Sequence, residues 1–185
     1  MARAPSEEPE GIVYRPELLS VEDEDELVRR MKTLRFDPIV LHGQAAKRTG
    51  RHYGLDYDYG SRTPMPGEPA PHWLLPVRAK AAALAGHDPE ELVEILVQRY
   101  PPGATIGWHR DAPAFGTVIG VSLGGFSRLR FQRGKREQRR VWEVMLEPRS
   151  GYVLSGEARR SWEHSIPPTK ELRYSITFRT LRKPD

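Results

Sequence analysis

The chain has 185 residues, enough for one well-buried core and short for two. It contains no cysteine, which excludes disulfide frameworks, thiolate catalysis and cysteine-based zinc sites, and leaves histidines and carboxylates as the strong metal ligands. Its formal net charge of +4 favours approach to a polyanion but does not by itself identify nucleic acid.

No stretch approaches the roughly 20 consecutive apolar residues of a membrane-spanning helix, and the first ten residues are acidic and contain proline. We therefore expect a cytoplasmic protein with no membrane partner. Residues 1–11 are expected to form a flexible tail, and residues 12–185 a single domain. A single domain of this size does not need a second copy, so we expect a monomer.

Two segments of the chain predict helices. Ser20 and Asp23 have the spacing of a capping box, and apolar residues then recur at helical intervals to about Leu34. A second helix is predicted over Trp73–Leu84, where apolar residues again repeat with helical spacing. Gly86 suits the end of this helix because glycine tolerates a positive φ.

The rest of the chain predicts turns and short strands. Residues 42–71 are rich in glycine and proline and lack helical periodicity, so they are predicted to form a long loop or hairpin region. Regularly spaced short strands indicate a sandwich or barrel. The expected strands are Ile12–Tyr14, Val93–Tyr100, Val118–Leu123, Leu129–Gln132, Val141–Leu146, Tyr152–Leu154 and Arg173–Thr180.

Three residues are candidate metal ligands. His109 and Asp111 are separated by one residue, so on an extended backbone both side chains project from the same face. His164, which follows a run of turn residues, is the candidate third ligand. Two histidines and one carboxylate make the facial triad of non-haem iron oxygenases, which leaves positions open for a keto acid and dioxygen. A His-x-Asp pair alone also occurs as surface or hydrogen-bonded residues, so its context matters.

The last predicted strand supplies this context. Its apolar residues alternate with a polar face that begins at Arg173 and ends at Arg179. At about 3.3 Å per residue the two backbones lie roughly 20 Å apart, so inward-leaning side chains leave a gap about the length of a five-carbon dicarboxylate. The arginine fork suits a carboxylate because it donates two parallel hydrogen bonds. The alternative is a surface strand with two solvated arginines.

Together these motifs resemble those of the AlkB-like iron(II)/2-oxoglutarate dioxygenases over about residues 92–182. Members carry an Asn-x-Tyr-x-x-Gly segment, a His-x-Asp and an Arg-Tyr-x-x-Thr-Phe-Arg terminal strand. Here the first segment reads Gln98-Arg-Tyr100-Pro-Pro-Gly103, so glutamine replaces the usual asparagine. The resemblance implies a mainly β (α+β) fold, a double-stranded β-helix or jelly roll of eight antiparallel strands. Two supporting helices would pack outside one sheet.

The resemblance also implies a cofactor set and roles for residues. Iron(II) would be held by the three candidate ligands, with 2-oxoglutarate and dioxygen as cosubstrates. Arg173 would pair with the distal carboxylate of 2-oxoglutarate, Tyr100 would support it, and Arg179 would lie near the end that chelates iron. Gln98 is a cosubstrate contact, and Ser175 stands where many relatives have asparagine.

In this family a variable lid holds a flipped nucleobase, and residues 42–71 occupy the corresponding place. Arg51, Tyr53 and Tyr57 within the lid, and Arg160 shortly before His164, are the candidate substrate-binding residues. Tyrosines would stack on bases, and arginines would engage phosphates. The alternative is that lid tyrosines two residues apart on one strand face pack on a sheet or help to cover the core.

The implied function is oxidative demethylation of alkylated bases in DNA or RNA, with release of formaldehyde, succinate and CO2. The expected partner is therefore nucleic acid that carries alkylated bases. One alternative keeps the oxygenase chemistry but acts on a protein or a small molecule. A second alternative is a catalytically silent nucleic-acid-binding module whose His/Asp cluster is structural or binds zinc.

Overall fold

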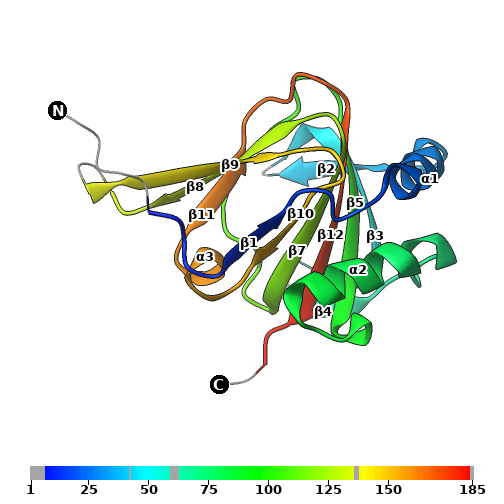
Figure 1. Ribbon diagram of the computed structural model, residues 1–185, viewed down its shortest axis with the longest axis horizontal. Helices are drawn as coiled ribbons and strands as arrows, with labels where there is room; N and C mark the ends of the chain where they lie inside the picture. The colour runs from blue at the N-terminus through cyan, green and yellow to red at the C-terminus, as the bar shows by residue number, and fades with distance from the viewer. Residues whose placement is uncertain (1–6, 42, 59–62, 136–137, 184–185) are drawn as a thin grey trace.

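The computed structural model describes residues 7–41, 43–58, 63–135 and 138–183. Its strands are β1 (Ile12–Arg15), β2 (Asp37–Leu41), β3 (Gln44–Asp58), β4 (Thr63–Pro66), β5 (Leu92–Tyr100), β6 (Ile106–His109), β7 (Phe115–Gly124), β8 (Ser127–Arg133), β9 (Arg140–Leu146), β10 (Gly151–Leu154), β11 (Glu163–Ile166) and β12 (Arg173–Leu181). They form two antiparallel sheets (Figure 1). The larger sheet has the order β1-β10-β7-β12-β5-β3-β2, with β4 paired to β3, and the smaller sheet has the order β6-β11-β8-β9.

The eight strands from β5 to β12 form the double-stranded β-helix that the sequence predicts. Apolar side chains from both sheets pack together between them, as in other two-sheet folds. The larger sheet is extended by β1 at one edge and by β3 and β2 at the other. The fold is therefore a jelly roll with added strands at the edges of one sheet.

Two helices cover the outer face of the larger sheet (Figure 1). In α1 (Val21–Lys32), Ser20 and Asp23 form the predicted capping box, and the helix ends two residues before the expected boundary. After a 3-10 turn at His72–Leu74, α2 (Leu75–Ala85) ends at Gly86, whose φ of 69° confirms the predicted left-handed cap. In the part of the chain described, no helix is long and apolar enough to cross a membrane.

Two expectations about the first half of the chain need correction. Residues 42–71 do form hairpins, but β3 is a 15-residue strand that pairs with β5 inside the larger sheet. The expected flexible tail is wrong at its inner end, because the carbonyls of Glu10 and Gly11 accept hydrogen bonds from Ala158 and Ser155. The backbone N–H groups that donate these hydrogen bonds belong to a short helix, α3 (Gly156–Arg160), and to the residue that precedes it, Ser155.

The alternation of β12 decides where a site can form. Tyr174, Ile176 and Phe178 point into the core beneath the helices. The intervening polar residues therefore face the smaller sheet, and four of them line one buried pocket: Arg173, Ser175, Thr177 and Arg179. We refer to this cavity as the inner pocket. Its polar wall and its position between the sheets follow from the period of two in a β-strand.

Candidate active site

The three predicted metal ligands meet in the inner pocket. His109 ends β6 and lies directly opposite His164 on β11, so the two ring centroids are 4.3 Å apart. Asp111 follows β6 by two residues and joins them. One ligand atom from each residue can be chosen so that all three lie within 4.8 Å of one another. This convergence of two imidazoles and one carboxylate could hold a divalent metal ion.

Hydrogen bonds orient the ligand atoms. His109 Nδ1 lies 2.8 Å from the carbonyl oxygen of Gly107, and because a carbonyl can only accept, Nδ1 carries the proton. Nε2 of His109 is thereby left with a lone pair for a metal. Asp111 Oδ2 is buried without a hydrogen-bond donor and lies 3.4 Å from His164 Nε2. A bare carboxylate oxygen beside two imidazoles is the arrangement expected of a metal site.

Electrostatics set the protonation states that metal binding needs. Burial raises the pKa of Asp111, but the charges of Arg179, His164 and His109 outweigh it and hold this pKa well below its usual range. Burial lowers the pKa of His164 to about 4, and Asp111 opposes this only in part. At neutral pH the cluster therefore offers an anionic carboxylate and, at His164, a neutral imidazole.

We expect the metal-free protein to lose stability as the pH falls from about 6.5 to about 4. His164 has an ordinary pKa of 6.5 and a folded pKa of about 4, so the unfolded state binds more protons in this interval. Neutral His164 makes its full contribution to the free energy of unfolding above its ordinary pKa. This contribution is a few kcal/mol at most, because stability changes by roughly 1.4 kcal/mol per pH unit. Thermal unfolding in EDTA across this range measures it, and His164→Gln should flatten the slope. Equal slopes would contradict the assignment.

Arg179 connects the metal cluster to a second carboxylate. Its Nε and Nη2 donate to Asp111 Oδ1 at 2.9 and 2.7 Å, and its Nη1 donates to Glu94 Oε2 at 2.6 Å. Glu94 is only 2% exposed, and its Oε1 lies 3.3 Å from Nδ1 of His52. Burial lowers the pKa of Arg179, but Glu94 and Asp111 raise it by more, so the guanidinium stays charged. Arg179 thus fixes Oδ1 of Asp111 and leaves Oδ2 for a metal.

Arg173 lies at the opposite end of the polar face of β12 and is fully buried. Its Nε donates to Ser122 Oγ at 2.9 Å, and its guanidinium carbon lies 4.9 Å from the centroid of the Tyr100 ring. Nη1 and Nη2 have no hydrogen-bond partner. A buried cation with two unpaired donors is costly unless an anion completes it. These two unpaired donors could therefore hold a ligand carboxylate.

The remaining predicted cosubstrate contacts lie between these two arginines. Gln98, Tyr100 and Ser175 line the inner pocket together with the metal cluster. The hydroxyl of Tyr100 donates to Gln98 Oε1 at 3.2 Å, so the residue that replaces the family's asparagine has a partner within the pocket. All eight residues predicted to bind metal or cosubstrate are thus brought together in one cavity.

The structure does not bring two of the predicted lid contacts, Arg51 and Tyr53, to this cavity. Tyr53 is 4% exposed and packs in the core beneath the helices, so its expected role in base stacking is wrong. Arg51 lies over the ring of Tyr53 and pairs with Asp37 and Glu68, away from the inner pocket. The backbone of Tyr57 belongs to β3, but its side chain lies outside the described residues.

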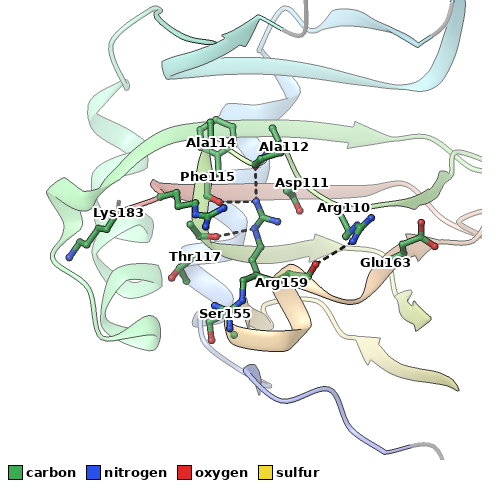
Figure 2. A pocket seen from close by; sticks show the side chains of 15 residues that line it. Arg110, Asp111, Ala112, Ala114, Phe115, Thr117, Ser155, Arg159, Glu163 and Lys183 are labelled. Carbon is green, nitrogen blue, oxygen red and sulfur yellow. Dashed lines mark hydrogen bonds between the residues drawn. The ribbon is translucent and has the colours of Figure 1, made fainter. Parts of the chain in front are cut away.

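A second, wider cavity of about 1610 Å3 adjoins the inner pocket, and we call it the outer cleft (Figure 2). It is lined by residues 110–117, by Arg182 and Lys183, and by five residues in and beside α3: Ser155, Gly156, Arg159, Arg160 and Glu163. Arg160, the fourth predicted substrate contact, lies here rather than in the inner pocket. The two cavities have one lining residue in common, Asp111.

Sequence reasoning missed several residues that shape the site. Glu94 is a charged residue within the apolar first part of β5 (Leu92–Val97), and such a carboxylate needs a buried cationic partner, so a signal was present. Ser122 and Arg159 gave no signal. Arg159 donates hydrogen bonds to the carbonyls of Ala112, Phe115 and Gly116 at 2.7, 2.8 and 3.0 Å, and thereby holds the loop that follows Asp111.

Comparison with known proteins gives matches across most of the chain. The family model described as the 2OG-Fe(II) oxygenase superfamily matches residues 15–179. The alpha-ketoglutarate-dependent dioxygenase AlkB of Salmonella typhimurium is 32% identical over 149 residues, which cover 71% of this chain and 65% of that protein. The tRNA (carboxymethyluridine(34)-5-O)-methyltransferase alkbh8 of Xenopus tropicalis is 29% identical over 171 residues, covering 88% of this chain and 26% of that protein.

The chain therefore spans between about a quarter and two thirds of the length of these curated relatives. Among solved structures, that of OsALKBH1 matches with a TM-score of 0.72 and covers 94% of this chain and 97% of that chain. Its sequence is 19% identical, so this likeness concerns the fold alone. The jelly roll and its flanking helices agree with it.

Proposed function

Because the chain belongs to the 2OG-Fe(II) oxygenase superfamily, we propose that it oxidatively removes methyl groups from alkylated bases in DNA or RNA. The products would be the demethylated base, formaldehyde, succinate and CO2. Membership of this superfamily implies iron(II), 2-oxoglutarate and dioxygen. The observation that carries the proposal is one buried pocket with a His/Asp/His cluster at one end and an arginine with two unpaired donors at the other.

The residues present fit the metal. His109, Asp111 and His164 would hold iron(II), since two imidazoles and a carboxylate suit non-haem iron and the buried Oδ2 of Asp111 has no other partner. When bound with its cosubstrates, the iron supplies the oxidation of a C–H bond in the methyl group. The protein holds Asp111 ionised and oriented through Arg179.

The residues present also fit 2-oxoglutarate. Arg173 would bind its distal carboxylate through Nη1 and Nη2, with Ser122 and the Tyr100 ring holding the guanidinium in place. Gln98 and Ser175 would contact the body of the molecule from the same wall. Apolar lining residues keep water from the reacting end, which limits side reactions: Ile106, Val118, Leu129 and Ile166.

A nucleic-acid substrate draws support from three observations. The chain resembles AlkB-like proteins, one relative is named as a tRNA methyltransferase, and the net charge is +4. A base in a duplex must leave the stack before a buried oxidant can reach it, so a pocket deep between two sheets suits a flipped or single-stranded base. We assign the catalytic core to residues 92–182, and the lid role to residues 42–71 without Arg51 and Tyr53, whose side chains do not line the inner pocket.

The substrate proposal is tested with single-stranded DNA and RNA oligonucleotides that carry one N-methylated base. Protein purified without oxygen is supplied with iron(II), ascorbate, 2-oxoglutarate and air, and succinate and formaldehyde are measured. We expect the methylated oligonucleotides to stimulate succinate formation and to yield formaldehyde. Unmethylated oligonucleotides of the same sequence should do neither, and His109→Ala should be inactive with both.

The other outcomes separate the alternatives. Succinate that forms without stimulation by methylated oligonucleotides would retain the oxygenase and overturn the nucleic-acid substrate, in favour of a protein or small molecule. If no succinate forms although the oligonucleotides bind, the chain would be a silent nucleic-acid-binding module.

A further inference from the structure

We propose that the outer cleft binds the phosphodiester backbone of the nucleic-acid strand whose base enters the inner pocket. This inference rests on the proposed function and deepens it, because it assigns the surface that holds the strand. It concerns binding rather than chemistry, so it is tested without the oxidation reaction.

Basic side chains outnumber acidic ones in the lining of the outer cleft. Only two of its lining side chains are acidic, and both carboxylates are engaged elsewhere. Asp111 is paired with Arg179, and Glu163 accepts a hydrogen bond from Gln132 Nε2 at 2.7 Å. Electropositive clefts of this kind attract phosphates. Five lining side chains are basic: Arg110, Arg159, Arg160, Arg182 and Lys183.

The shape of the outer cleft is held by hydrogen bonds across its floor (Figure 2). Arg159 reaches from α3 to three carbonyls of the loop at residues 112–116. Arg110 Nη1 lies 3.4 Å from the carbonyl oxygen of Arg160 and spans the same gap. These contacts tie α3 to the loop that follows the metal ligand, so a bound strand would meet a surface that is already formed.

The position of the outer cleft explains its use. It meets the inner pocket at Asp111, so phosphates bound in the cleft would hold a nucleotide beside the metal cluster. Phosphate contacts fix the register of a strand without reading its sequence, which suits an enzyme that must act on a modified base in any context.

Three arginines on the β8–β9 hairpin are poorer candidates for this role. Arg133, Arg128 and Arg140 pair with glutamates as Lys183 does, but none of these three arginines lines the outer cleft or the inner pocket. Within the outer cleft, Lys183 lies 3.2 Å from Glu91, but its side chain is 84% exposed and such pairs contribute little. The ammonium of Lys183 thus remains open to a phosphate.

The experiment measures binding of fluorescein-labelled single-stranded DNA and RNA of one unmethylated sequence by anisotropy at several KCl concentrations. The test protein carries Arg160→Glu and Lys183→Glu. The matched control carries Arg128→Glu and Arg140→Glu, which change the net charge equally but lie outside the cleft. We expect the test protein to bind about ten- to a hundredfold more weakly and to lose about one to two units of salt slope. The control should stay within about threefold of the wild type.

Equal losses in the two double variants, unchanged binding by the test protein, or no binding by the wild type would each overturn the cleft assignment. Thermal unfolding midpoints verify that each variant is folded, and Arg160→Gln with Lys183→Gln serves if the reversals destabilise the protein. Cleft-dependent binding without oxidation of methylated oligonucleotides would retain the cleft and overturn the proposed function. Oxidation of methylated oligonucleotides with unchanged binding by the test protein would retain the proposed function and overturn the cleft assignment.

Discussion

Replacement of Arg173 by methionine is expected to weaken 2-oxoglutarate binding by more than about a hundredfold, because removal of one partner from a buried charge pair costs roughly 3–5 kcal/mol. The ligand-free protein should be at least as stable as the wild type. Nη1 and Nη2 of Arg173 are buried without partners, and an apolar side chain of similar length removes this cost. The measurements are the dissociation constant of 2-oxoglutarate by calorimetry and the thermal unfolding midpoint with and without it.

Two controls sharpen the test of Arg173. Arg78→Met makes the same chemical change at a residue that pairs with Glu90 outside the inner pocket, and it should leave 2-oxoglutarate binding unchanged. Arg173→Lys keeps the charge but loses the two-pronged geometry, so it should fall between the methionine variant and the wild type. If 2-oxoglutarate stabilised Arg173→Met as much as the wild type, the carboxylate site would lie elsewhere.

Replacement of Asp111 by asparagine is expected to reduce iron-dependent succinate formation by at least about a hundredfold, since the amide lacks the anionic oxygen that a divalent metal requires. The side chain keeps its shape, so the inner pocket should remain intact. Iron affinity, measured by anaerobic titration, should fall in parallel. Treatment with EDTA should abolish turnover by the wild type, and added iron(II) should restore it, whereas Asp111→Asn should not recover.

Glu94→Gln separates the loss of a metal ligand from the loss of charge around Arg179. It removes the second carboxylate of Arg179 without touching the metal cluster. We expect it to lower stability while iron still binds, because Asp111 continues to hold Arg179. An equal loss of iron affinity in Glu94→Gln and Asp111→Asn would show that Asp111 acts through the charge network rather than as a ligand.

Patterns local in sequence predicted much of this molecule. The capping box at Ser20 and the glycine at position 86 mark helix ends because they satisfy or shape only neighbouring backbone groups. The alternation along β12 placed Arg173 and Arg179 on one face, since side chains of a strand point to opposite sides in turn. The candidate ligands were predicted because a one-residue spacing and a later histidine are typical of the facial triad, and the structure brings the three side chains together.

Tertiary packing determines which face of a strand points toward the inner pocket. β3 lies in a sheet with helices on one side and a second sheet on the other, so alternation alone does not say which face is which. Register decides it: Tyr53 lies opposite Ile95, and both belong to the core beneath the helices. The sequence therefore identified an aromatic, basic segment, but its pattern could not predict which of these side chains face the inner pocket.

By itself the sequence predicted the class of fold, the candidate metal ligands and the two arginines proposed to bind the cosubstrate, because motif spacing, strand periodicity and the resemblance that these motifs carry can all be read along the chain. Only the tertiary structure decided that Glu94 pairs with Arg179, that Arg159 holds the loop after Asp111, and that a basic cleft adjoins the metal cluster. These contacts join residues far apart in the chain, and the long-range packing of two sheets and α3 creates them.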